Sequence, residues 1–332
     1  MIGRLLALRS WPGFRAMRRR ELSKLVCACA IVATAACGSG APGESAAHPV
    51  LRYLTPASPG AFSAGLTEGV QSAMPDVQVE SVHTSGSLVV LSSLQQGKGD
   101  FGFSLADVAY MAYRKGLDGE AFPHDNLRAV AVRWMSTMYA LVPRDGPIHS
   151  VSDFKGLRVG IVGPGSAGEL LTRLLLEAHG LTYDQLRPVF SEPERLAARI
   201  KAGELDAAIY PATPLSDVNT LMETYGLRAV ELDRDVVRRL QAEYPFVKSV
   251  SLESGLVGSS GRLSVGVDSV LVTRADLDER LVYGLTRVIH SILSDMARTQ
   301  PGVDPNTAAA APIPLHPGAA RFYRERQVLN ES

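Results

Sequence analysis

Short apolar runs alternate with helix-like stretches along most of this chain, and this alternation limits the possible folds more than any other feature. The first such unit runs from an apolar stretch at residues 51–55 to a helix-like stretch at residues 62–73. Alternation of this kind is typical of α/β proteins, in which helices cover a largely parallel sheet. The sequence therefore predicts an α/β fold.

The same patterns place the remaining elements. The expected strands are 51–55, 77–82, 101–104, 127–134, 139–142, 157–162, 189–190, 207–210, 229–232 and 265–272. The expected helices are 62–73, 88–95, 108–113, 169–178, 194–201 and 281–298, followed by a C-terminal segment at 315–327. We expect the strands from 157 to 232 to form a second, parallel unit, and strand 265–272 to cross back to the first.

The first 36 residues have the pattern of a secretory signal peptide. Seven basic residues and one acidic residue occupy positions 1–24, and an apolar run follows at 25–36. That run is shorter than the ~20 residues a membrane-spanning helix needs. Thr34-Ala35-Ala36-Cys37 is similar to a bacterial lipobox, whose cysteine is acylated, and residues 37–49 read as that acylated cysteine with a flexible tether. Arg19-Arg20 also resembles a twin-arginine signal, so the export route stays open.

Cysteine and charge counts exclude several classes of protein. All three cysteines lie at or before Cys37, so the exported part has no disulfide, cysteine nucleophile or cysteine-bound metal. Outside positions 1–24 there are 27 basic and 33 acidic residues, and no basic run that would attract nucleic acid. The remaining length suits two lobes better than one.

Three strand-to-helix loops are rich in glycine, serine, threonine and other small residues: 56–60, 84–87 and 163–168. Such loops let backbone N–H groups approach a ligand, and the following helix start adds a partial positive charge. We expect them to hold a carboxylate, although ordinary helix capping explains each loop equally well. In open α/β sheets, ligands bind beyond the carboxyl ends of the strands.

Other site chemistries are poorly supported. The glycines of 163–168 fit the dinucleotide spacing, but Glu169 stands where a phosphate-binding loop carries lysine. The seven histidines show no metal-ligand spacing, and Ser166 lies outside a nucleophile elbow. We therefore expect no catalytic residue, metal or cofactor. Asp107 and Trp134 are candidates for facing a cleft, against the simpler roles of helix capping and core packing.

An ordered set of motifs resembles the TAXI family of TRAP-transporter solute receptors. Thr84-Ser85-Gly86-Ser87, Asp100-Phe101-Gly102 and Asp107 are similar to its helix start, strand entry and following turn. Leu127-Arg128-Ala129-Val130-Ala131 and Gly163-Pro164-Gly165-Ser166-Ala167-Gly168 resemble two later segments, and Leu315-His316-Pro317-Gly318-Ala319 a C-terminal one. The resemblance spans residues 51 to about 326.

This resemblance implies a two-lobed periplasmic-binding-protein fold, type II-like, with a ligand cleft between the lobes. It implies lobe 1 at 50–145 plus 263–330 and lobe 2 at 146–262. It also implies a small carboxylate ligand, glutamate or dicarboxylate-like, delivered to the membrane permease subunits of a TRAP-type transporter. The ligand-binding residues it implies are Ser58, Phe62, Thr84, Ser85, Gly86, Ser87, Asp107, Trp134, Gly165, Ser166, Ala167, Gly168 and Tyr210.

Departures from the family pattern fall at this expected site. The first loop holds one glycine and one aromatic residue, and Ser85 and Ala167 replace family residues. The sequence thus predicts an extracytoplasmic, lipid-anchored, monomeric solute-binding receptor that performs no chemistry. An ABC-importer receptor and a sensing lipoprotein that partners a membrane kinase are the alternatives.

Overall fold

The structure is a computed structural model that describes residues 49–56, 61–117, 122–164, 168–214, 216–252, 262–300 and 302–331. Within these residues, the strands form a ten-stranded mixed sheet in the order β2-β1-β3-β10-β4-β7-β5-β6, with β8 paired to β4 and β9 to β10. The expected α/β class is confirmed. The N-terminal signal, Cys37 and the tether up to residue 48 lie outside the described residues.

The strands are β1 (Val50–Pro56), β2 (Gln78–Thr84), β3 (Phe101–Leu105), β4 (Leu127–Pro143), β5 (Arg158–Ile161), β6 (Arg187–Phe190), β7 (Ala207–Ala212), β8 (Leu227–Val230), β9 (Lys248–Leu252) and β10 (Arg262–Arg274). The α-helices are α1 (Ala61–Ala73), α2 (Ser87–Gln95), α3 (Ala106–Lys115), α4 (Glu169–Ala178), α5 (Pro193–Lys201), α6 (Val218–Tyr225), α7 (Arg234–Glu243), α8 (Glu279–Met296) and α9 (Pro317–Glu331). None of the described helices is long and apolar enough to span a membrane.

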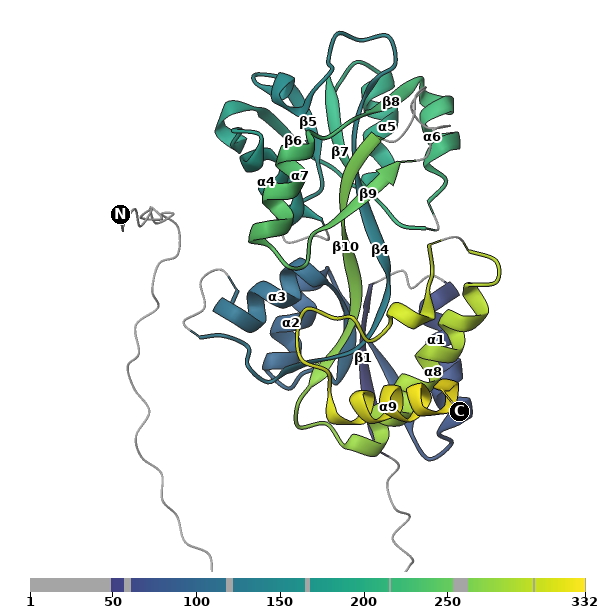
Figure 1. Cartoon of the computed structure of the whole chain (residues 1–332). Coiled ribbons are helices and arrows are strands. Elements are labelled where there is room, and N and C mark those ends of the chain that lie inside the picture. The colour runs from purple at the N-terminus through teal and green to yellow at the C-terminus, as the bar shows by residue number, and fades with distance from the viewer. Residues whose placement is uncertain are drawn as a thin grey trace, which may run out of the picture. The chain divides into compact units, whose positions relative to one another are not determined.

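Two long antiparallel strands, β4 and β10, join the two halves of the sheet (Figure 1). One half holds β1, β2 and β3, and we call it lobe 1 together with α1, α2, α3, α8 and α9. The other half holds β5, β6, β7 and β8, and we call it lobe 2 together with α4, α5, α6 and α7. Because β4 and β10 run through both halves, the boundaries near residues 146 and 263 stay a prediction.

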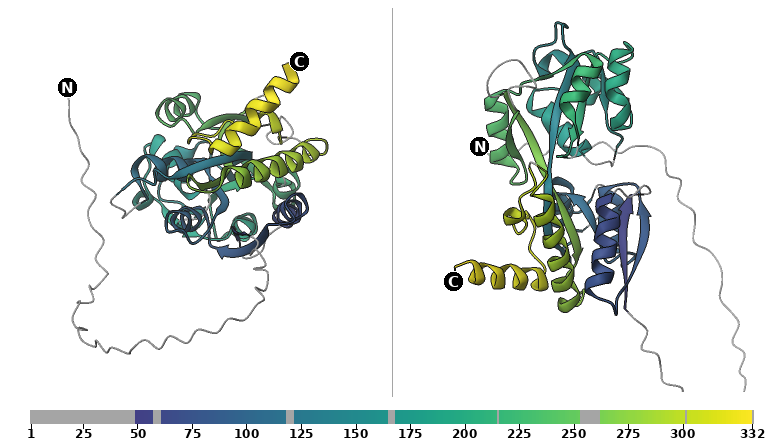
Figure 2. Two further views of the ribbon diagram at one scale, coloured as in Figure 1. Left: turned by 90° about the horizontal axis from the view of Figure 1, so that it is seen from below. Right: turned by 90° about the vertical axis from the view of Figure 1, so that its right-hand side faces the viewer.

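Helices cover both faces of the sheet. In lobe 1, α1, α8 and α9 form one apolar core against the sheet, and α9 packs across α8 (Figure 2). The apolar residues of α2 and α3 belong to a second core, which also takes in α4 and α7 of lobe 2. The helices α5 and α6 cover a third. Each lobe is therefore held by burial of apolar side chains on both sides of its strands.

The two lobes repeat one another with an offset of 106 residues. The range of α2, shifted by 106, coincides with that of α5, and β3 shifted likewise begins where β7 begins. The sheet order agrees as well: from the edge to the centre, lobe 1 has β2-β1-β3-β10 and lobe 2 has β6-β5-β7-β4. The pairing types match as well, since β1 and β5 each lie parallel to both of their neighbours.

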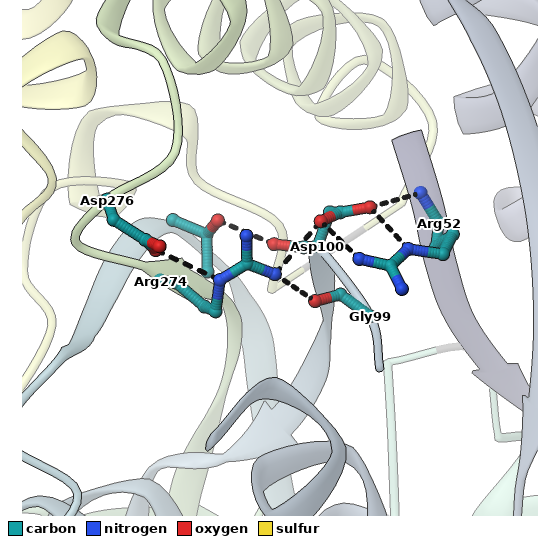
Figure 3. Close-up of polar contacts among 6 residues, drawn as sticks. Arg52, Gly99, Asp100, Arg274 and Asp276 are labelled. Carbon is teal, nitrogen blue, oxygen red and sulfur yellow. Dashed lines mark hydrogen bonds and ion pairs between the residues drawn. The ribbon is translucent and has the colours of Figure 1, made fainter. Parts of the chain in front are cut away.

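An arginine–aspartate pair marks the same position in each repeat. Arg52 donates to Asp100 from its backbone N–H at 2.8 Å and from its guanidinium at 3.0 and 3.1 Å (Figure 3). Arg158 donates in the same way to Asp206, at 2.8, 3.1 and 2.6 Å. Both pairs tie the first strand of a lobe to the start of its third strand, at the end away from the strands' carboxyl termini. They therefore fasten the strands of each lobe to one another.

Three expectations about the elements are wrong. Residues 127–134 and 139–142 belong to one long strand, β4, and not to two. Strand β8 pairs antiparallel with β4, so lobe 2 is not wholly parallel. The helices α6 and α7 were not expected, although Asp217 and Asp233 cap their first N–H groups and Gly226 ends α6 in the left-handed conformation.

Candidate ligand-binding cleft

A cavity of about 750 Å³ lies where residues of both lobes meet. Its lining comes from the start of α2, from the crossing strands β4 and β10, and from the loops that precede α4, α5 and α6. The lining residues include Ser85, Leu88, Val89, Leu105, Arg133, Trp134, Ser136, Ser269, Gly163, Pro164, Ser191, Glu192, Glu194, Pro211 and Thr213. The size and the mixed lining are those of a small-molecule site.

A smaller cavity of about 190 Å³ adjoins the first within lobe 1. It shares Leu105, Arg133 and Ser269 with the larger cavity. The rest of its lining consists mainly of hydroxyl-bearing and apolar side chains, which are Tyr53, Leu54, Ser63, Thr84, Gly86, Ser87, Val90, Phe103 and Ser104. Arg133 therefore stands where the two spaces join.

Arg133 is held by aromatic rings and lacks an anionic partner. Its guanidinium carbon lies over three rings, at 3.7 Å from the centroid of Trp134, 4.1 Å from that of Phe103 and 4.9 Å from that of Phe62. It donates one hydrogen bond, from Nη2 to Ser269 Oγ at 3.1 Å. Its Nε is buried and has no acceptor within the described part of the chain, where no carboxylate forms an ion pair with it. Such a cation is available to an anionic ligand.

A β-bulge in β4 explains why Arg133 and Trp134 both reach the cavity. On β10, Val270 pairs with Val132 and Ser269 pairs with Trp134, so Arg133 has no partner of its own. Consecutive strand residues ordinarily point to opposite faces, and an extra residue interrupts this alternation. The bulge thus lets two neighbouring side chains line the same site.

The electrostatics of the site favour an anion. Burial lowers the pKa of the Arg133 guanidinium to about 9, so it still carries its charge at neutral pH. The indole Nε1 of Trp134 is also buried without an acceptor among the described residues. Buried donors are normally satisfied, and a ligand oxygen would satisfy both of these.

Most of the lobe 1 residues predicted as ligand-binding lie at the two cavities. Ser85 and Trp134 line the larger cavity, while Thr84, Gly86 and Ser87 line the smaller. Ser87 Oγ also accepts the backbone N–H of Leu105 at 3.1 Å, which fixes the start of α2 to the end of β3. Phe62 lines neither cavity; its ring meets that of Trp134 edge to face. Phe62 therefore contributes to the site indirectly, by packing against Arg133 and Trp134.

Asp107 lies outside both cavities. It is fully buried at the start of α3, where its Oδ1 accepts the Val108 N–H at 2.8 Å. Burial raises the pKa of Asp107 to about 6, and Oδ2 has no partner among the residues described. The structure thus gives it a local role at the first turn of α3 and no contact with either cavity.

The remaining predicted residues are less well supported. Ser58, Gly165, Ser166 and Ala167 lie outside the described residues. Gly168 stands at the N-cap of α4 with a φ of 87° and packs against Met138 and Pro211; it lines neither cavity itself. Tyr210 is buried in the core beneath α5 and α6, and its neighbour Pro211 lines the cavity in its place.

Arg133, the one positively charged lining residue among those described, was not predicted from the sequence. A cation inside the apolar run 127–134 was the available signal, because strands buried on both faces rarely carry one. Ser269 was not predicted either, nor were three residues at and just before the start of α5, which are Ser191, Glu192 and Glu194. The described residues hold no group of three or more His, Cys, Asp or Glu side chains that could bind a metal ion.

A model of the NMT1-like family matches residues 62–326 of the chain. The chain belongs to the NMT1-like family. This NMT1-like protein is also similar in structure to XAC2383 from Xanthomonas citri bound to chloride ion, at 15% identity and a TM-score of 0.50, over 85% of this chain and 99% of that one. At 15% identity, the similarity between the two structures shows a shared fold and nothing about the ligand.

Two further structures similar to the NMT1-like protein carry functional titles. The alkanesulfonate-binding protein SsuA from Xanthomonas axonopodis pv. citri, bound to MOPS, is 17% identical with a TM-score of 0.47, over 84% of this chain and 83% of that one. The substrate-binding protein of an amino acid ABC transporter is 11% identical with a TM-score of 0.43, over 74% and 94%. Both titles name binding proteins. The expected two-lobed periplasmic-binding-protein fold is confirmed.

Proposed function

We propose that this protein is an extracytoplasmic solute-binding receptor whose ligand is a small organic anion held by Arg133. The observation that carries this proposal is the Arg133 guanidinium, which is caged by rings, unpaired with any described carboxylate and present in both cavities. An aromatic cage orients a guanidinium and leaves its edge for a bidentate partner. Carboxylate, sulfonate and phosphonate groups all fit that chemistry, and alkanesulfonate is the ligand named for one structural relative.

Calorimetric titration with organic anions of these three types tests the proposal. Arg133→Gln removes the charge and should weaken binding by about 100-fold, since losing a buried charged partner costs roughly 3 kcal/mol. Arg133→Lys keeps the charge without the planar fork and should fall between Arg133→Gln and the wild type. Arg114→Gln, on the exposed end of α3, is the matched control and should bind as wild type does. Equal affinity in Arg133→Gln and wild type would refute the proposal.

The class of importer that receives the ligand is a finer proposal. The sequence resemblance implied a TRAP-type transporter, which none of the related structures cited above names. One of them is titled as the substrate-binding protein of an amino acid ABC transporter. We therefore place an ABC-type permease first and a TRAP-type permease second. ATP depletion should abolish uptake by an ABC importer, whereas collapse of the ion gradient should abolish uptake by a TRAP transporter.

Membrane attachment through Cys37 belongs to the same proposal. The lipobox-like sequence and the small-residue tether that follows support acylation of this cysteine. In cells that process lipoproteins, Cys37→Ser should release the protein from the membrane fraction, and mass spectrometry should detect acyl groups only on the wild type. Wild-type protein without acyl groups would contradict the lipid anchor and leave the receptor proposal intact.

A further inference from the structure

The charged side chains that line the larger cavity have opposite signs on its two sides. Arg133 is the cation, and it rests on Phe62 and Phe103 of lobe 1. Glu192 and Glu194 are the anions, and both stand at the start of α5 in lobe 2. The other described lining residues are neutral. The cavity is therefore polarised from one lobe to the other.

Comparison of the two repeats shows that only lobe 2 has negatively charged residues at this helix start. With the 106-residue offset, Glu192 corresponds to Gly86 and Glu194 to Leu88, because α5 corresponds to α2. The start of α2 thus offers an anion its backbone N–H groups and partial positive charge. At the start of α5, two carboxylates offset that partial charge.

Helix capping does not account for both glutamates. Glu192 occupies the N-cap position of α5, but its side chain makes no capping hydrogen bond. Neither carboxylate forms an ion pair with a residue that the structure describes, and both side chains are exposed. Two unpaired carboxylates on the wall of a cavity that also holds an unpaired guanidinium favour a ligand with a charge of each sign.

We infer that the ligand carries a protonated amine in addition to its anionic group. This inference rests on the proposed function: the anion pairs with Arg133, and the amine lies toward Glu192 and Glu194. A dicarboxylate would place its second negative charge against these glutamates and should be rejected. The class is that of amino carboxylates, amino sulfonates and amino phosphonates.

Calorimetric titration with three probe pairs tests this inference. The pairs are β-alanine and propionate, taurine and ethanesulfonate, and 2-aminoethylphosphonate and ethylphosphonate; succinate is added as a dianion. The proteins are wild type, Glu192→Gln, Glu194→Gln and the double variant. Glu223→Gln is the control, because Glu223 is exposed on α6 of the same lobe and does not line the cavity.

In the wild type, the amine-bearing member of at least one pair should bind about five- to tenfold more tightly, the range expected for two partly exposed ion pairs. The double variant should bring that ratio close to one without weakening the amine-free member, and Glu223→Gln should leave it unchanged. Anions that bind through Arg133 with no preference for the amine would overturn this inference and leave the proposed function standing. Failure of every probe to bind would overturn both.

Discussion

Replacing Asp100 by asparagine should destabilise the protein far more than the equivalent change at Asp206. Both aspartates accept three hydrogen bonds from the arginine at the matching position of the first strand. Asp100 accepts a fourth, from Arg274 Nη1 at 2.9 Å. Its side chain is 6% exposed, whereas that of Asp206 is 30% exposed. The repeat therefore supplies two copies of one interaction in different surroundings.

The expected loss follows from burial. Removing one partner of a buried ion pair costs about 3–5 kcal/mol, and the partial exposure of Arg52 brings our expectation for Asp100→Asn to about 2–4 kcal/mol. Arg158, the partner of Asp206, is exposed, so solvent compensates for most of its lost contact and Asp206→Asn should cost much less. Urea unfolding followed by far-ultraviolet circular dichroism measures both losses as differences in the free energy of unfolding.

The pH dependence gives a second readout of the same reasoning. Burial alone would raise the pKa of Asp100, but the hydrogen bonds from Arg52 and Arg274 outweigh it and lower the pKa below the ordinary 3.8. A carboxyl with a lowered folded-state pKa contributes stability above pH 3.8 that is lost as the pH falls through the folded value. Asp100→Asn should therefore be less sensitive to acid below about pH 4. Equal losses at Asp100 and Asp206, or an unchanged acid limb, would show that burial does not set the strength of these pairs.

Four further changes test other parts of the structure. Because burial raises the pKa of the Asp107 carboxyl, Asp107→Asn should stabilise the protein at pH 7 by roughly 1–3 kcal/mol. It should also remove the fall in stability that the wild type shows as the pH rises from about 4 to 6, and urea unfolding across that pH range measures both effects. Gly168→Ala should cost about 1 kcal/mol or more, since φ is 87° and the new Cβ would lie 3.2 Å from Pro211 Cβ. Gly65→Ala, in open space on α1, should instead stabilise by about 0.5–1 kcal/mol, and thermal unfolding compares the two. Trp134→Phe should weaken anion binding about three- to tenfold through loss of the Nε1 donor, with little change in stability, and titration would detect unchanged affinity as a contradiction.

The regular elements were predictable because their signals are local. The expected helix 169–178 matches α4 residue for residue, since apolar spacing and the preceding glycine act within a few positions. The long strand β4 was divided because its sequence turns polar at Ser136 and Thr137. Those residues cross between the lobes beside the cavity, where Ser136 faces it. A strand that turns polar where it passes a binding site thus has the sequence pattern of a loop.

The binding site was harder to predict because its main residue depends on a change of register. Without the bulge, the alternation of β4 would direct Arg133 and Trp134 to opposite faces of the sheet. Nothing in the sequence 127–134 marks the extra residue. The repeat was also hard to detect from the sequence, because the two halves share few identical residues. Leu51-Arg52 corresponds to Leu157-Arg158, Gly97 to Gly203, and Asp100 to Asp206. The shared arginines and aspartates fasten the strands. At the cavity, Ser85 and Ser191 are also shared, whereas Leu88 and Glu194 differ.

The separation between the residues that fasten the strands and those that line the cavity explains how two similar lobes can form the two different sides of one binding site. The arginine–aspartate pairs hold the same strands in both lobes, and they lie at the end of those strands away from the cavity. The helix starts at the other end are then free to differ, as Gly86 and Glu192 do. Arg133 stands on a strand that both lobes share, so a ligand bound to it that also reaches α5 contacts both halves. Contacts with both lobes favour the arrangement in which the lobes are close, and binding is thereby coupled to closure of the cleft.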